Sequence, residues 1–432
     1  MSAKKHIISN LITKLAIYPI SFISSVVVAR ILGPEDRGVY AYLLLIVSFV
    51  IPIFSLGVGG GITYMVSSKK YSPKESGFSA FTIGLTLGVL LSFILYLGWY
   101  LKILGITGNN LSFFELVILL ISLIFSATYF MISRILFGDS KFIEMNWITI
   151  LQGLLNPIFL ITFVWILALG INGAAISLLL INFVTVVYGV YYFFRFYHPT
   201  LSLNPNFMSE SFKYGFKGWF GDMAIRANVR LDQVILASVA SSAILGIYSI
   251  AVLLVELLWI LPDSLGPILF NKLAAEDDIE KKLEITYKIN RLLLSLTFVF
   301  SIFLTLGTFF IIIPYGYGDK YVTALIPFLV LIPGTIFYVV TKVITKILSG
   351  SGLIGVSSKV IVSGSLISIL LYFLLIPRYG MIGAALASSL GYITISFFSL
   401  YYFKRYIKQS IFPFFNFCKA DFIWAYQMIR KK

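Results

Sequence analysis

The chain has 432 residues, of which 59% are hydrophobic and only 12% are charged. Soluble globular domains contain about 25% charged residues, so this composition excludes an ordinary soluble protein and indicates a polytopic membrane protein. The net charge of +15 could suggest nucleic-acid binding, but the positions of the charges assign them to membrane topology. The single cysteine, Cys418, excludes an internal disulfide, and no cysteine–histidine cluster predicts a metal site.

Apolar runs of about 20 residues, long enough to cross a hydrocarbon core of about 30 Å, recur along the chain. They predict helices, because the strands of a membrane β-barrel are shorter and half polar. The first run begins near Ile7 and lacks the features of a cleaved signal peptide, so we expect a retained span. The fold class is therefore all-α. Twelve spans are predicted, at residues 8–31, 38–66, 77–100, 112–133, 146–169, 171–194, 216–240, 243–270, 289–313, 321–346, 358–376 and 380–403.

Lysine and arginine are unevenly distributed between the two sides of this arrangement. If the N-terminus is cytoplasmic, the inner segments hold 26 of the 33 basic residues and the outer connections hold five. The positive-inside rule then predicts that both termini are cytoplasmic. The two remaining basic residues, Arg226 and Arg230, lie inside a predicted span. Residues 408–432 are aromatic and end in three basic residues, which predicts a tail lying along the cytoplasmic interface.

Short sequence matches recur at a nearly constant offset of 208 to 212 residues. We therefore predict two six-helix bundles in the same orientation, residues 1–195 and 196–407, with a substrate site between them. The alternative is that such motifs reflect only generic packing of small residues between helices. The matching pairs are GINGAAIS at 170 with GMIGAALA at 380, RILFGDS at 134 with KILSGSG at 346, and GVYA at 38 with GIYS at 246.

Four polar residues of the seventh predicted span share one helix face. Asp222, Arg226, Arg230 and Gln233 follow one another at steps of four, four and three, and residues at these spacings project from the same side of a helix. An arginine at the bilayer centre costs about 2.5–3.5 kcal/mol on insertion scales. We therefore expect this face to line a polar cavity, while Asp232 points in another direction.

Two interpretations of the arginines stay open. In one, Asp222 and Arg226 form a structural ion pair, and Arg230 pairs elsewhere, for example with Glu256 of the eighth span. In the other, Arg226 and Arg230 form a clamp for phosphate, because guanidinium keeps its charge and its planar fork fits phosphoryl oxygens. Glu256 is also a candidate site for proton or cation coupling. Arg30, at the outer end of the first span, is either an interfacial residue or a substrate contact.

The N-terminal stretch SNLITKLAIYPISFISSVVVARILGPEDRGVYAYLLLI, with the later RILFGDS and LGINGAA positions, resembles the O-antigen (Wzx-type) flippases of the multidrug/oligosaccharidyl-lipid/polysaccharide (MOP) exporter superfamily. The resemblance extends over all twelve spans. It implies a MATE-like, V-shaped pair of bundles with a central cavity in the bacterial inner membrane. Such a protein moves an undecaprenyl-diphosphate-linked oligosaccharide, an O-antigen or capsule repeat unit, between the leaflets by alternating access.

The resemblance also implies roles for individual residues. Cationic residues are typical of the central cavity in this family, which matches Arg226 and Arg230, while Gln233 and Asn228 would hydrogen-bond the sugar chain. Asp222, Asp232 and Glu256 would then serve as coupling or ion-pair residues. Proton or sodium coupling and a polysaccharide polymerase partner are in keeping with the same family, and no cofactor is expected.

The nearest alternative is a cation-coupled multidrug exporter of the same superfamily. Those relatives typically carry an acidic residue deep in the first helix, whereas residues 7–29 contain no Asp or Glu. A membrane-embedded glycan polymerase, which is an enzyme, would need a large outer loop, and the outer connections here are short. There is no P-loop motif, and His6 and His198 lie at cytoplasmic edges. We therefore expect a transporter that is not an enzyme.

Overall fold

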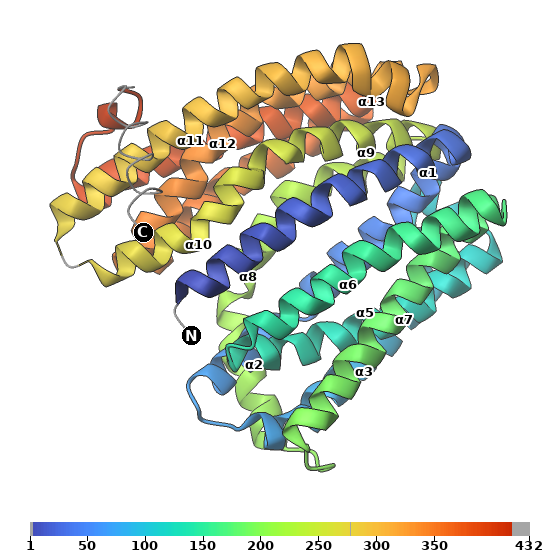
Figure 1. Ribbon diagram of the computed structural model, residues 1–432, viewed down its shortest axis with the longest axis horizontal. Coiled ribbons are helices and arrows are strands. Elements are labelled where there is room, and N and C mark those ends of the chain that lie inside the picture. Colours follow the sequence, from blue (N-terminus) through green and yellow to red (C-terminus); the bar gives the residue numbers. More distant parts are fainter. Residues whose placement is uncertain (1–2, 277, 417–432) are drawn as a thin grey trace. The chain divides into compact units, whose positions relative to one another are not determined.

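The computed structural model describes residues 3–276 and 278–416 (Figure 1). Every regular element within these two ranges is a helix, as the composition predicts. The elements are α1 (Ala3–Phe54), α2 (Val58–Ser67), α3 (Pro73–Tyr100), α4 (Gly105–Asn109), α5 (Phe113–Gly138), α6 (Phe142–Leu160), η1 (Ile161–Ile166), α7 (Gly170–Tyr197), α8 (Pro205–Val239), α9 (Ser242–Glu256), η2 (Leu257–Trp259), α10 (Ile260–Ala275), α11 (Ile279–Gly307), η3 (Thr308–Tyr317), η4 (Asp319–Ala324), α12 (Leu325–Gly350), α13 (Ile354–Ile407) and η5 (Phe412–Phe414).

Nine helical segments within the described ranges are long and apolar enough to cross a membrane. Two of these segments contain two spans each, because the backbone of Gly33 in α1 and of Gly380 in α13 leaves the helical conformation and divides the helix into two arms. Helix α8 is not among the nine, since charged residues lie along its length, but its 35 residues extend over roughly 50 Å. The two breaks and α8 account for the twelve predicted spans.

The second span was predicted as one continuous helix over residues 38–66, and this prediction is wrong. Helix α1 ends at Phe54, and α2 begins only after Gly57. Leu56 and Gly57 have φ angles of 48° and 79°, which are incompatible with a continuing right-handed helix. A Cβ atom on Gly57 would lie only 2.2 Å from the carbonyl oxygen of Gly215, so the glycine permits close approach of α8. Hydrophobicity does not reveal this break, because the chain is apolar on both sides of it.

The repeated glycine motifs have matching backbone geometry. Gly170 and Gly380, which occupy the same place in the two copies, have φ angles of 56° and 55°. Three residues later, a Cβ atom on Gly173 or Gly383 would lie 2.5 or 2.1 Å from a carbonyl oxygen of the preceding segment. Both copies therefore use one glycine to turn the chain and the next to pack it closely. The division into bundles at residues 195 and 196 stays a prediction.

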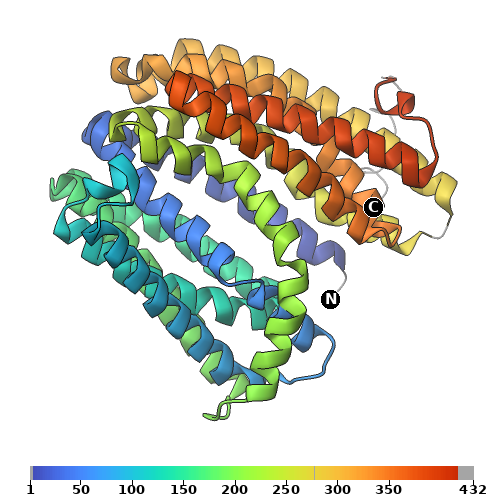
Figure 2. The same cartoon turned by 180° about the vertical axis from the view of Figure 1, so that it is seen from behind.

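The chain packs as two compact units, and the division between them crosses α8, of which residues 227–232 belong to the second unit, and α9 after residue 247. The first unit contains α3, α5 and α7 side by side and α1 against α6 (Figures 1 and 2). Ile62, Met131 and Phe193 are among its buried core residues. In the second unit α12 packs along α13 and against α10 and α11. The first unit contains the described residues of 1–226, 233–247 and 316–320, and the second those of 227–232, 248–315 and 321–432.

The beginning of the predicted tail packs against α11. The Tyr287 hydroxyl donates a 2.7 Å hydrogen bond to the carbonyl oxygen of Ser410, and Arg291 Nη1 donates one of 2.8 Å to that of Pro413. Phe414 is fully buried between Tyr287 and neighbouring rings. Residues 417–432 lie outside the described residues, so the interfacial position predicted for them stays a prediction.

Candidate functional site

Helix α8 carries the polar residues that the sequence singles out. Its first turn is fixed by Asn204, whose Oδ1 accepts a 3.0 Å hydrogen bond from the backbone nitrogen of Phe207, with Pro205 at the first helical position. The helix then continues without a break to Val239. Asp222, Arg226, Arg230 and Gln233 therefore lie on one side of a single helix, as their spacing predicts.

Arg230 forms a two-pronged ion pair with Glu256 at the end of α9. Its Nη1 lies 2.7 Å from Oε1, and its Nη2 donates a 3.2 Å hydrogen bond to Oε2. The two side chains are 34% and 29% exposed, so most of the surface of each is buried against other protein atoms. This is the partner that one interpretation of the sequence proposed for Arg230. The guanidinium is thus compensated within the protein itself.

A second ion pair of the same unit joins Lys342 of α12 to Asp263 of α10. Lys342 Nζ lies 2.5 Å from Asp263 Oδ1, and it also lies 4.3 Å from the centre of the Trp259 ring. Electrostatic and cation–π contacts therefore both hold the ammonium group in place. Together with Arg230 and Glu256, this gives two cations and two carboxylates, a set without net charge.

Arg226 has different neighbours from Arg230, although only four residues separate them on α8. Its charged neighbours in the first unit are Asp222, four residues earlier, and Arg134 of α5, which repels it. Within the described residues, neither Arg134 nor Arg226 lies at salt-bridge distance from a carboxylate. We call Arg134, Asp222 and Arg226 the arginine cluster. It contains two cations and one anion and carries one excess positive charge.

Arg134 is held by contacts that leave part of its guanidinium without a partner. Its guanidinium carbon lies 4.4 Å from the centre of the Phe130 ring, one turn earlier on α5. Its Nε is buried and has no hydrogen-bond partner in the described structure. A buried donor without a partner is costly, so this arginine is ready to bind an acceptor.

Asp232 and Asn228, also predicted as site residues, belong to a buried network of the second unit. Asp232 is 2% exposed and accepts hydrogen bonds from the hydroxyls of Tyr248 at 2.6 Å and Ser388 at 3.1 Å. Asn228 is fully buried, and its Nδ2 donates to Ser368 Oγ at 2.9 Å. Both side chains are thus engaged with protein groups.

The two remaining predicted contacts are Gln233 and Arg30. Gln233 is only 7% exposed, and Arg30 is an exposed residue near the end of the first arm of α1, three positions before Gly33. The structure therefore brings Asp222 and Arg226 together and pairs Arg230 with Glu256.

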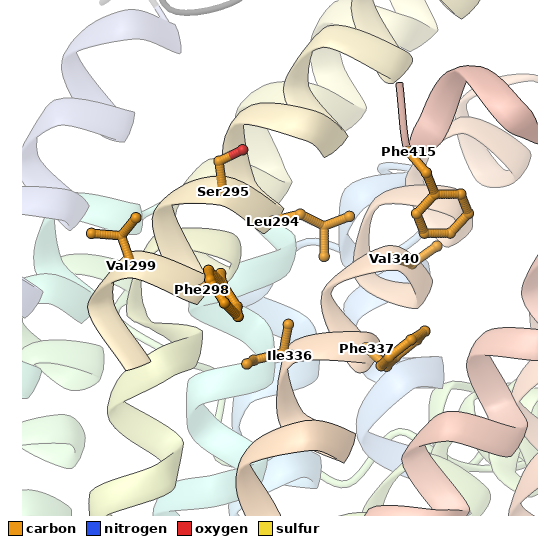
Figure 3. Close-up of a pocket in the computed structure, with 8 residues that line it drawn as sticks. All are labelled: Leu294, Ser295, Phe298, Val299, Ile336, Phe337, Val340 and Phe415. Atoms are coloured by element: carbon orange, nitrogen blue, oxygen red, sulfur yellow. The ribbon is translucent and has the colours of Figure 1, made fainter. Parts of the chain in front are cut away.

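An apolar pocket of about 590 Å³ opens between α11 and α12 (Figure 3). Its only polar side chain is that of Ser295, and none of the predicted site residues lines it. Such a surface is suited to hydrocarbon, not to an anion or a sugar. The lining residues are Leu294, Ser295, Phe298, Val299, Ile336, Phe337, Val340 and Phe415.

Comparison with known proteins identifies the family. A family model described as polysaccharide biosynthesis protein matches residues 3–269. The chain belongs to this family. It is similar to the capsular polysaccharide biosynthesis protein CapF of Staphylococcus aureus, with 24% identity over 394 residues that cover 89% of this chain and 95% of that protein.

Solved structures show the fold of this polysaccharide biosynthesis family member. The lipid II flippase MurJ, in an inward closed conformation, matches with a TM-score of 0.74 and 16% identity, covering 97% of this chain and 95% of that one. An inward-facing multidrug resistance MATE transporter of the MOP superfamily matches with a TM-score of 0.74 and 15% identity, covering 91% and 98%. The all-α membrane fold and the MOP resemblance predicted from the sequence are confirmed.

Sequence reasoning missed Arg134 as a member of the candidate site. The residue stands at the start of RILFGDS and was counted among the basic residues of a cytoplasmic segment. Its flanking residues, FMIS before it and ILF after it, are almost all apolar, which is the signal that places it inside a helix end.

Proposed function

We propose that this protein is a flippase that moves an undecaprenyl-diphosphate-linked oligosaccharide, an O-antigen or capsule repeat unit, across the bacterial inner membrane by alternating access. The family match, the similarity to CapF and the fold shared with MurJ support a transporter of lipid-linked substrates. Both termini lie in the cytoplasm in this proposal, as the distribution of lysine and arginine predicts.

The observation that carries the proposal is the excess positive charge of the arginine cluster. Arginines within membrane helices are costly unless they are paired or serve a function. Asp222 can offset one of the two guanidinium groups, and a bound diphosphate would offset the other. Guanidinium groups bind phosphoryl oxygens through paired, charge-assisted hydrogen bonds. This charge balance favours an anionic cargo over the organic cation that a multidrug exporter would carry.

The proposal assigns roles to the predicted residues. Arg226, with Arg134, binds the diphosphate, whereas Arg230 and Glu256 form a structural ion pair. Asp232 is the candidate coupling carboxylate for a proton or a sodium ion, because it is buried among hydroxyl groups. Gln233, Asn228 and Arg30 would contact the cargo only in another state of the cycle. A polysaccharide polymerase remains the proposed partner.

Complementation tests this assignment. In a strain that lacks its own flippase, the wild-type chain should restore surface polysaccharide, and Arg134→Gln and Arg226→Gln should each lower it by at least tenfold at equal protein levels. The matched control is the double variant Arg230→Gln with Glu256→Gln, which removes two charges without changing the net charge and should retain transport. Full polysaccharide with Arg134→Gln and Arg226→Gln combined would overturn the proposal.

A further inference from the structure

A row of four aromatic rings, three of them exposed, lies on the N-terminal part of α8. We call Phe212, Phe216, Trp219 and Phe220 the aromatic platform. The rings of Phe212 and Phe216 lie 5.8 Å apart at 22°, and those of Phe216 and Trp219 lie 5.7 Å apart at 16°, so three ring planes are nearly parallel. Phe212, Phe216 and Phe220 are 42%, 39% and 56% exposed.

This stretch of α8 is firmly attached to the first unit, in part through Trp219 of the platform itself. Trp219 Nε1 donates a 2.7 Å hydrogen bond to the carbonyl oxygen of Ile53, one of the last groups of α1. A Cβ atom on Gly61 of α2 would lie 1.8 Å from the carbonyl oxygen of Ser211, which shows how closely the two helices approach. The platform is therefore preorganised, and little side-chain order would be lost when a ligand binds to it.

The surroundings of the platform are not those of a lipid-facing helix. Lys213, Lys217 and Gly218 alternate with the rings and are exposed as well. Two exposed lysines within five residues indicate contact with water at this N-terminal end of the α8 span. Contiguous exposed rings in such an environment mark a binding surface.

The platform is aligned with the arginine cluster. Phe212, Trp219 and Arg226 follow one another at intervals of seven residues, which is close to two helical turns, so they lie on one side of α8. Seven residues correspond to about 10 Å along the helix axis. A sugar joined to a diphosphate at Arg226 would therefore lie over the rings of the platform.

We infer that the aromatic platform binds the sugar rings nearest to the diphosphate of the lipid-linked cargo. The apolar face of a pyranose, formed by its C–H groups, stacks on a flat aromatic ring, while its hydroxyls stay in contact with water. The platform distinguishes glycosylated from sugar-free polyprenyl diphosphate, which the arginine cluster by itself does not. This inference rests on the proposed function and adds a second, sugar-binding part to the same site.

Two probes separate the inference from the proposed function. Purified protein in nanodiscs is titrated with a polyprenyl diphosphate that carries one N-acetylhexosamine and with the same lipid without the sugar. Phe212→Leu with Phe216→Leu should weaken binding of the glycosylated probe about tenfold, and leave the sugar-free probe unchanged. Phe212→Tyr with Phe216→Tyr keeps the rings and should bind both probes as the wild type does. The matched control is Phe303→Leu with Phe310→Leu, two rings of α11 and η3 that are 67% and 68% exposed.

Each result has a distinct meaning. If the leucine pair weakens both probes equally, or neither, the sugar-binding inference is overturned while the proposed function stands. If the wild type binds neither probe, the proposed function fails and the inference fails with it. If Arg134→Gln weakens both probes and the leucine pair weakens only the glycosylated one, both are supported.

Discussion

The Arg230–Glu256 ion pair predicts how stability responds to the loss of one or both charges. Glu256→Gln leaves a largely buried guanidinium without its carboxylate, and Arg230→Gln leaves the carboxylate without its guanidinium. The double variant removes both charges together. Removing one partner of a buried ion pair lowers the free energy of unfolding more than removing both, because the remaining charge is desolvated and has no partner.

The geometry sets the size of the effect. Two charges about 4 Å apart attract each other by about 4 kcal/mol at an effective dielectric constant of about 20. Exposure of 34% and 29% allows water to screen part of this attraction, and desolvation opposes it further. We therefore expect each single variant to lower the free energy of unfolding by about 2 kcal/mol. The double variant should be less destabilised than the sum of the two by about 1–2 kcal/mol.

Thermal unfolding of the four proteins in one nanodisc composition measures this coupling. Additive losses in the two single variants would mean that the charges do not interact, and would refute the ion pair. The same proteins reveal the role of Arg230 in transport. Suppose that the double variant unfolds like the wild type but no longer restores polysaccharide. That result would favour the other interpretation, in which Arg230 binds phosphate together with Arg226.

Two further predictions concern packing and the buried network. Gly61→Ala should lower the yield of folded protein, because its Cβ would lie 1.8 Å from the carbonyl oxygen of Ser211. Gly60→Ala is the control, because no atom lies within 4 Å of the position of its Cβ. Equal yields of the two variants would argue against the close approach of α2 and α8. Tyr248→Phe removes the 2.6 Å hydrogen bond to buried Asp232 and should lower the free energy of unfolding by about 2 kcal/mol, measured by thermal unfolding. Tyr191→Phe, at a ring that is 62% exposed, should have no effect, and a Tyr248→Phe protein as stable as the wild type would contradict the network.

The positions of the spans were predictable because a membrane helix is specified by local composition. Runs of about 20 apolar residues cannot satisfy their backbone groups in hydrocarbon except as helices, whatever the rest of the chain does. The face shared by Asp222, Arg226 and Arg230 followed from helical periodicity for the same reason. Glu256 was a reasonable partner for Arg230, since it is a carboxylate inside the next span.

Breaks within helices and contacts between helices were harder to predict from the sequence. The kink at Gly33 lies where one span was expected to end, but the non-helical turn at Leu56 and Gly57 falls inside an apolar run and leaves no trace in hydrophobicity. The proximity of Arg134 to Arg226 depends on how α5 packs near α8, between residues that are far apart in the sequence. Arg37, in the second arm of α1, is 5% exposed and donates a 3.3 Å hydrogen bond from Nη2 to Ser25 Oγ of the first arm, a contact between the two arms on either side of the break at Gly33.

The difference between the two charged groups links the structure to the transport cycle. The second unit balances Arg230 and Lys342 with two carboxylates, and so needs no ligand to stabilise its charges. The arginine cluster of the first unit leaves one guanidinium uncompensated, and an arginine within a membrane helix is costly unless it is paired. A diphosphate offsets this cost only while it is bound. In the proposed function, cargo binding would stabilise whichever state of the protein encloses the cluster, and such a differential affinity is what a ligand needs to shift a conformational equilibrium.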